Sequence, residues 1–437
     1  MNNTTQRNIT DFFSNEVRDF SVYACKRAIP SGIDGFKPSQ RKILFGMSKE
    51  YPTQEVKVSI AAATIMAVSC YHHGSLEGVM INMAQNFPGS NNTPLLEGIG
   101  QFGSRLSPDA AAPRYIFTKL SSACKQLFHS VDDNILEWEE DDGTRIEPKF
   151  YLPILPMVLV NGASGMGTGY ATNIPGHNPK DLKDAVVAIL NGKKPKPLVP
   201  WYRGFSGTIT SDGKQNTISG VLESINTTQL VIKELPVGNY TIAYRDVLNS
   251  LEDSGMIKSY DDNSSEEKTE FIIHVTRAFS SGTQADLMKI FKLVSRDTPN
   301  LVVWDENHKI RKFADTMELL KWFVGYRLTK YEDRRQYMLR AAANAHAALT
   351  EEMKFIRLYL KRSTVWSKTA AAIIEQELVD AGFSSPKSLL SIRISRLNAD
   401  AIQELQSKIL DKEAEIAKLT ASTATDLYLE DLSNLKV

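Results

Sequence analysis

KPSQRKILFGMSKEYPTQEVKVSIAAATIMAVSCY, residues 37–71, contains two helix patterns with a turn between them. The first, up to Tyr51, is basic and amphipathic, and the second, from Val56, is largely apolar. Two successive helices joined by a turn predict a helix-turn-helix, although any helical bundle contains such pairs. The region is also locally basic, because residues 26–57 carry seven Lys or Arg against three acids, which favours contact with a phosphate backbone.

The charge of the whole chain points the other way. Its 51 basic and 51 acidic side chains cancel, which argues mildly against a nucleic-acid-binding protein when only the total is considered. Residues 132–147 carry a run of acids that no phosphate backbone would attract. We expect this stretch to be a solvated acidic linker.

Length and composition limit the class of protein. The 437 residues, of which 42% are hydrophobic, predict an ordered, soluble protein of about two to four domains. Cys25, Cys70 and Cys124 share no metal-ligand spacing, so neither a zinc site nor a disulfide framework is expected. No apolar run is long enough to cross a membrane, and the sequence shows no signal peptide. We therefore expect a cytoplasmic protein without a membrane partner.

Two further regions differ in pattern from the helical start of the chain. Gly and Pro punctuate residues 148–178, whose short apolar segments favour buried strands and tight loops. From about 200 to 310, β-branched and polar residues alternate, as in QLVIKELP and EFIIHVT, which predicts an α+β insertion domain. SYDDNSSEEKTE within it is expected to be a polar loop.

The last third of the chain has heptad spacing. A first apolar seam predicts a long coiled-coil-like helix from about 315 to 362, interrupted at Arg335 and Glu352. A second seam runs from Ile402 to Leu419. The segment between them, 363–398, contains one helix pattern and a turn at Pro386. Two long helices around a small tip predict a projecting antiparallel arm; the alternative is that both helices pack on one core.

Candidate catalytic residues are few. Arg114 directly precedes Tyr115 in DAAAPRYIF, and a phenol that attacks phosphorus needs neighbouring cations, which a guanidinium supplies. On spacing alone such a pair is far more often ordinary packing. YHHG, residues 71–74, suits phosphate contact or acid-base work, or a plain capping or core role. The glycine-rich NGASGMGTGYATNIP has no lysine motif for ATP, and no tight Asp and Glu cluster for Mg²⁺ is visible.

Several blocks, in order, resemble the breakage-reunion region of the DNA gyrase A and topoisomerase IV A family of type IIA topoisomerases. The short, tail-less form most resembles the medium subunit of tailed-phage enzymes. The matching blocks are KRAIPSGIDGFKPSQRKILFGM (26–47), YHHG (71–74), LLEGIGQFGS (95–104), DAAAPRY (109–115) and LPMVLVNGASGMGTGYATNIPGHN (155–178).

The resemblance implies roles for individual residues. Tyr115 would be the nucleophile that forms a 5′-phosphotyrosyl bond, with Arg114 and Arg27 stabilising the scissile phosphate and His73 assisting. The DNA-binding positions implied are Lys37, Arg41, Lys42, His72 and Met166. The family usually has Tyr-His-Pro-His-Gly, so the missing proline leaves the roles of His72 and His73 open. Met166 stands where the family places an apolar wedge between base pairs.

The resemblance also implies an architecture: a multidomain α+β protein with a winged-helix DNA-gate domain (1–150), an α/β tower (151–314) and a coiled-coil arm (315–437). The arm would end in a dimerisation tip at about 363–398. Two copies would form the gate in double-stranded DNA. ATP and most of the Mg²⁺ site would belong to a partner ATPase/Toprim subunit, and the reactions expected are relaxation and decatenation rather than negative supercoiling.

Other functions stay open at this point. A non-catalytic DNA-bending or scaffold protein could keep the gate fold without cutting, and a cellular topoisomerase IV-type subunit would share the same motifs. A tyrosine recombinase is disfavoured because its HxxR companion to a C-terminal tyrosine is absent.

Overall fold

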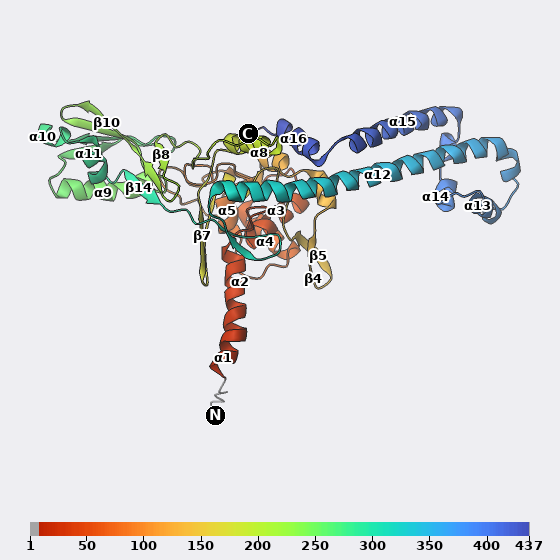
Figure 1. The fold of residues 1–437 in the computed structure, drawn as a ribbon, viewed down its shortest axis with the longest axis horizontal. Helices are drawn as coiled ribbons and strands as arrows, with labels where there is room; N and C mark the ends of the chain where they lie inside the picture. Colours follow the sequence, from red (N-terminus) through yellow and green to blue (C-terminus); the bar gives the residue numbers. More distant parts are fainter. Residues whose placement is uncertain (1–7, 437) are drawn as a thin grey trace. The chain divides into compact units, whose positions relative to one another are not determined.

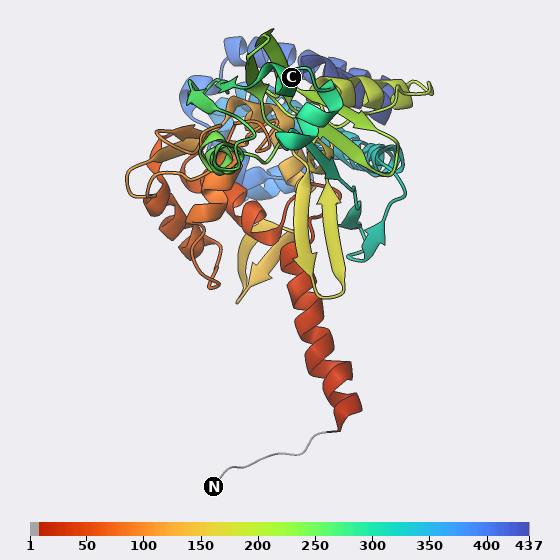
Figure 2. The same ribbon diagram turned by 90° about the vertical axis from the view of Figure 1, so that its left-hand side faces the viewer.

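The computed structural model describes residues 8–436 (Figures 1 and 2). The described residues up to Arg327, together with those from Asp431, form one compact unit, and Leu328–Glu430 form a second. Helices and strands occur together in the first unit, and a long helix runs into the second. The expected α+β class is therefore confirmed. Among the described residues, no helix is both long enough and apolar enough to cross a membrane.

The helix-turn-helix expected at the start of the chain is present. α3 spans Pro38–Glu50 and α4 spans Val58–Val68. The two helices pack closely at Gly46, where an added Cβ would lie 2.5 Å from the Ile65 side chain. The surrounding elements are α1 (Ile9–Phe12), a π-helical turn (Phe13–Val17), α2 (Arg18–Ala28), α5 (Glu77–Ala84), α6 (Ser122–Leu127) and the antiparallel sheet β1 (Val56–Lys57), β3 (Phe117–Leu120), β2 (Leu96–Ile99).

The acidic stretch is folded, so the expectation of a solvated linker is wrong. A 3-10 turn (Ser130–Asn134) leads into a hairpin of β4 (Trp138–Asp141) and β5 (Thr144–Pro148). Asp132 is buried against Arg327, and Glu147 is buried 2.7 Å from the Lys42 ammonium. Buried carboxylates with a cation partner are stable where isolated ones would not be, and charge count alone does not reveal such partners.

A second hairpin lies beside α2. β6 (Ala163–Gly167) and β7 (Tyr170–Ile174) are antiparallel, and β6 packs against α2. Both elements project from the same side of the first unit (Figures 1 and 2). The apolar run before them forms a short helix, α7 (Met157–Val160), rather than a strand, and α8 (Pro179–Leu190) follows.

The region from 200 to 310 contains the strands expected from alternation. A four-stranded antiparallel sheet has the order β10 (Val221–Asn226), β11 (Gln229–Glu234), β13 (Phe271–His274), β12 (Ser259–Asp262). β12 occupies part of the expected polar loop, because its pairing with β13 outweighs its polar composition. Tyr244 and Leu248 of α9 (Thr241–Asp253) pack on this sheet with Leu287 of α11 (Gln284–Ile290). The remaining elements are β8 (Thr208–Ser211), β9 (Asn216–Ser219), α10 (Arg277–Ser280), β14 (Val294–Asp297), β15 (Val302–Trp304) and β16 (Ile310–Lys312).

The long helix α12 spans Thr316–Trp366, 51 residues or about 75 Å at 1.5 Å per residue. It pairs in the second unit with α15 (Ala399–Ala421), and Arg335 at the seam donates to the Leu419 carbonyl at 3.2 Å. Between them lie α13 (Ala371–Asp380), α14 (Pro386–Leu390) and a 3-10 turn (Ile394–Arg396), with α16 (Ala424–Asn434) after α15. Pro386 starts α14 rather than making a turn, because proline suits the first position of a helix.

Candidate active site

Tyr115 lies on a loop fixed to the start of α4. The first free N–H groups of a helix need acceptors, and here the Val58 N–H donates to the Ile116 carbonyl at 3.1 Å and the Ser59 N–H to that of Pro113 at 3.4 Å. The loop backbone is thus held while the Tyr115 side chain is 68% exposed. Such a large exposed aromatic on an anchored loop is well placed to meet an external ligand.

Arg114 accompanies this tyrosine. Its guanidinium carbon lies 4.7 Å from the centroid of the Tyr115 ring, within the range of a cation–π contact. Within residues 8–436 the structure gives the Arg114 guanidinium no ion pair or hydrogen bond, and the residue is exposed, so its N–H donors face solvent. A cation with free donors beside an exposed phenol can bind a phosphate placed next to that phenol.

Arg27 and His73 lie in a second group, brought together by a residue that the sequence analysis did not select. Tyr23 and Arg27 are one turn apart on α2, with the guanidinium 5.6 Å from the tyrosine ring centroid. The Tyr23 hydroxyl lies 3.2 Å from each ring nitrogen of His73. A helical i, i+4 spacing was the signal available for Tyr23, but nothing in the sequence joins it to residue 73.

The loop that carries both histidines follows the end of α4. The Tyr71 N–H donates to the Met66 carbonyl at 3.0 Å and Cys70 has a φ of 49°, which is the Schellman arrangement that ends a helix. His72 and His73 are exposed beyond it. The structure therefore places the two imidazoles outside the core, where the plain core role is excluded.

Lys37 is attached to the hairpin beside α2. Its ammonium donates to the Ser164 carbonyl at 2.8 Å, and partial burial lowers the pKa of this lysine. Met166 on the same hairpin is 88% exposed. Strand alternation explains this, because Gly165 and Gly167 face α2 and the side chain between them must point the opposite way.

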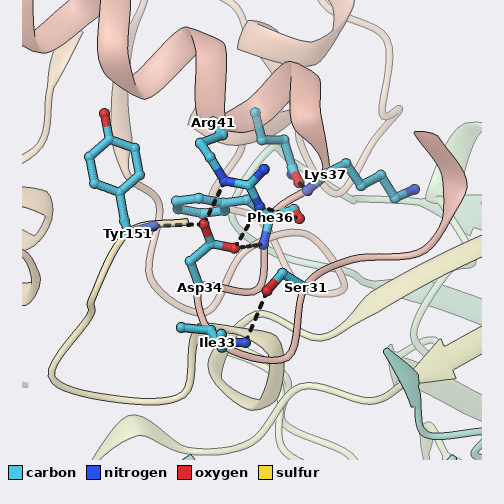
Figure 3. Close-up of polar contacts among 8 residues, drawn as sticks. Ser31, Ile33, Asp34, Phe36, Lys37, Arg41 and Tyr151 are labelled. Atoms are coloured by element: carbon cyan, nitrogen blue, oxygen red, sulfur yellow. Dashed lines mark hydrogen bonds and ion pairs between the residues drawn. The ribbon is translucent and has the colours of Figure 1, made fainter. Parts of the chain in front are cut away.

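Arg41 lies in an internal network and not on the surface (Figure 3). Its guanidinium donates to both carboxylate oxygens of Asp34, at 2.7 and 3.1 Å, and to the Phe36 carbonyl. The Asp34 carboxylate also accepts the N–H groups of Phe36 and Tyr151. Burial alone would lower the pKa of Arg41, but the charge of Asp34 and its hydrogen bonds raise it. The network fixes the turn before α3.

Lys42 is likewise committed to the fold. Its ammonium donates to the Ser69 carbonyl at 2.7 Å and lies 2.7 Å from Glu147, tying α3 to the end of α4 and to β5. Arg41 and Lys42, expected to contact DNA, are thus each paired with a buried carboxylate, and removing either cation from it would leave a charge uncompensated. Both residues support the surface on which Lys37 lies.

The predicted residues thus fall into separate groups in the structure. Tyr23 contacts both Arg27 and His73, the Lys37 ammonium is hydrogen-bonded to the hairpin that carries Met166, and the Arg114 guanidinium lies over the Tyr115 ring. Asp34 was missed by the sequence analysis because an isolated acid in a basic stretch gives no sign of its partners. Asn92 was missed as well; its amide donates to the carbonyls of Val160, His177 and Trp201.

The site does not offer a complete magnesium centre. Across residues 8–436, no group of three or more His, Cys, Asp or Glu side chains could hold a metal ion. Mg²⁺ prefers several oxygen ligands, and the groups around Tyr115 and Arg27 are cationic or aromatic. These residues therefore do not fit the ion by themselves.

Known proteins resemble this chain along nearly its whole length. DNA topoisomerase 2, mitochondrial, of Dictyostelium discoideum is 36% identical over 446 residues, covering 98% of this chain and 35% of the relative. Human DNA topoisomerase 2-beta is 37% identical over 388 residues, covering 86% of this chain and 24% of the relative. The chain thus spans about a third or less of the curated relatives it matches.

The fold also matches a solved structure. The crystal structure of the Plasmodium falciparum topoisomerase II DNA-binding, cleavage and re-ligation domain superimposes with a TM-score of 0.90 and 34% identity, covering 97% of this chain and 63% of that one. The family model for the A subunit of DNA gyrase/topoisomerase IV matches residues 27–434. The chain therefore belongs to the family of DNA gyrase and topoisomerase IV A subunits.

Proposed function

We propose that this chain is the DNA cleavage and religation subunit of an ATP-dependent type II DNA topoisomerase. The observation that carries the proposal is Tyr115: an exposed phenol on a loop anchored to a helix start, with a free guanidinium over its ring. The names of the relatives and of the matched cleavage domain support it.

The reaction is a transesterification at one phosphodiester of each strand. The Tyr115 phenol loses its proton to a base, and its oxygen attacks the phosphorus. A 5′-phosphotyrosyl bond forms as the bond from phosphorus to the 3′ oxygen breaks, and that oxygen takes up a proton to leave as a hydroxyl. One ester replaces another, so little free energy is lost and the reverse step rejoins the strand. Arg114 would neutralise charge that builds up on the phosphate.

The other groups would hold the DNA. Arg27 is exposed, with donors free for a phosphate, and His73 and His72 lie on the loop next to it. Lys37 would add a cation at the base of the hairpin, where Met166 is exposed enough to enter between base pairs. Such a wedge bends the duplex, which would open the backbone toward the tyrosine.

Cofactors would come mainly from a partner. The chain has no nucleotide-binding motif, and its described residues offer no metal cluster, so we assign ATP and most Mg²⁺ ligands to a separate ATPase/Toprim subunit. Bound Mg²⁺ would polarise the scissile phosphate. Residues 151–314 would form the tower that supports flanking DNA, and two copies of the chain would close the gate. We propose relaxation and decatenation as the reactions.

The test is a cleavage assay with the purified chain, its ATPase/Toprim partner, Mg²⁺ and supercoiled DNA, quenched with detergent. The native chain should leave protein linked to 5′ ends, and Tyr115→Phe should leave none while binding DNA as before. Tyr359→Phe, the same kind of change on α12 within the second unit, is the matched control and should cleave normally. If native and Tyr115→Phe proteins both bind DNA and neither cuts, the chain is a scaffold and the proposal fails.

A further inference from the structure

Tyr23 connects two residues that the proposed cleavage step uses. Its ring lies 5.6 Å from the Arg27 guanidinium, one helical turn further along α2. Its hydroxyl lies 3.2 Å from both Nδ1 and Nε2 of His73, which stands 50 positions later in the chain. One side chain therefore touches both a cation on a helix and an imidazole on a loop.

Neither neighbour is held firmly by other means. Within residues 8–436 the structure gives the Arg27 guanidinium no hydrogen bond or ion pair, so the ring contact positions it while all its N–H donors stay free. His73 precedes Gly74, whose φ of 99° and empty surroundings mark a loosely packed turn. The edge of the Tyr71 ring, with centroids 5.8 Å apart, is the other aromatic contact of His73.

The hydroxyl of Tyr23 can form a hydrogen bond with His73 in either protonation pattern of the imidazole. It can donate to one ring nitrogen or accept from the other, so the contact forms with either tautomer of His73. Phenylalanine would keep the ring beside Arg27 and its contact with the His73 ring, at 5.7 Å between centroids, and would lose only the hydroxyl contact. The two functions of the side chain can therefore be separated by substitution.

We propose that Tyr23 is a positioning residue that sets the spacing of Arg27 and His73 for a single DNA phosphodiester. The proposal rests on the proposed function and adds a residue to its machinery. An arginine and a histidine on separate elements bind one phosphate well only when their distance is fixed beforehand, and the phenol of Tyr23 fixes it at both ends.

The experiment measures single-turnover cleavage of a duplex by the complete complex, with duplex affinity measured separately by fluorescence anisotropy. Tyr23→Phe should lower the cleavage rate constant about three- to tenfold, as expected for one lost hydrogen bond, with little change in affinity. Tyr23→Leu should lower it further, since it also removes the ring under Arg27. Tyr359→Phe is again the control and should cleave at the native rate.

A double-mutant cycle separates positioning from general destabilisation. In the His73→Ala background, Tyr23→Phe should have almost no further effect, because the partner of the hydroxyl is gone. The inference is overturned if Tyr23→Phe cleaves at the native rate, or if it lowers the rate equally with and without the His73 ring. Failure of the proposed function is a different result, in which the native chain and Tyr115→Phe give the same absence of linked DNA.

Discussion

His177, at the scale of single residues, makes the stability of the first unit depend on pH. Burial lowers the pKa of this histidine from 6.5 to about 4, although its bonds to the Leu159 and Pro175 carbonyls oppose the shift. Between these two pH values the unfolded chain binds a proton that the folded chain does not. The contribution of His177 to the free energy of unfolding is therefore fully present above pH 6.5. It decreases as the pH is lowered from 6.5 to about 4, and it changes no further below that pH.

The measurement compares the native chain with His177→Gln in urea unfolding at pH 7 and pH 5. Gln keeps a donor for the Leu159 carbonyl but cannot take up a proton. The stability advantage of the native chain over the variant should shrink by about 2 kcal/mol from pH 7 to pH 5. An advantage that is equal at both pH values would show that His177 is not the group that titrates.

The contacts of the basic residues show what a sequence can and cannot predict about single side chains. Tyr115 and Arg114 were selected through the resemblance to a known family, and both side chains are exposed in the structure. Arg41 and Lys42 belong to the same basic helix as Lys37, yet they bind Asp34 and Glu147. A cation's partner depends on contacts across 7 and 105 positions, respectively, and local composition carries no information about the second of these.

At the scale of elements, the position of the β6–β7 hairpin depends on two small residues. Its packing against α2 depends on Gly165 and Gly167, since an added Cβ would lie 2.1 Å from the Ala28 carbonyl oxygen or 2.9 Å from the Cys25 sulfur. Gly165→Ala should therefore push the hairpin off α2 and cost about 1–3 kcal/mol in thermal unfolding, the usual range for overpacking. It should also disturb Lys37, whose ammonium would lie 3.3 Å from the new methyl group.

Gly78→Ala is the matched control for this change. Gly78 lies in α5 with open space around the position of a Cβ, so the same substitution should raise helix stability by up to about 1 kcal/mol. A loss of stability with Gly165→Ala and a gain with Gly78→Ala would support the conclusion that the hairpin packs tightly on α2. A neutral Gly165→Ala protein would mean that hairpin and helix can separate without cost.

Elements with strong periodicity were predicted well, and short ones were not. α3, α4 and α12 begin and end close to the bounds their patterns indicated, and β11 and β13 follow the alternation. The β4–β5 hairpin was missed because its residues are acidic, and its stability comes from Arg145 over the Trp138 ring, at 3.4 Å, and from the bond between Glu147 and Lys42. Such pairings form only when distant elements meet.

At the scale of the whole molecule, the heptads predicted a pair of long helices but not how the chain associates. The seam positions Ile356 of α12 and Leu405 of α15 are buried in one core cluster of the second unit. Tyr331 of α12 is buried as well and stacks on Tyr428 of α16. In the segment between the two helices, Leu378 and Leu389 join the core of this unit, but other apolar side chains such as Ile373 and Ile394 remain exposed. We expect a partner chain to cover them, and a single sequence contains no direct sign of such a partner.

The dimer is the prediction that belongs to this scale. From Val365, in the last turn of α12, to the start of α15, four large apolar side chains are 50–81% exposed: Val365, Ile373, Val379 and Ile394. Exposed apolar side chains gathered in one segment usually mark a surface that another chain covers. We expect the native chain to be a dimer at micromolar concentration in sizing with light scattering, and Ile373→Asp with Ile394→Asp to weaken it at least about tenfold by burying unpaired charges. Leu410→Asp, at an equally exposed position on the shaft of α15, should leave the dimer intact. A native monomer, or equal dissociation by Leu410→Asp, would place self-association elsewhere in the chain.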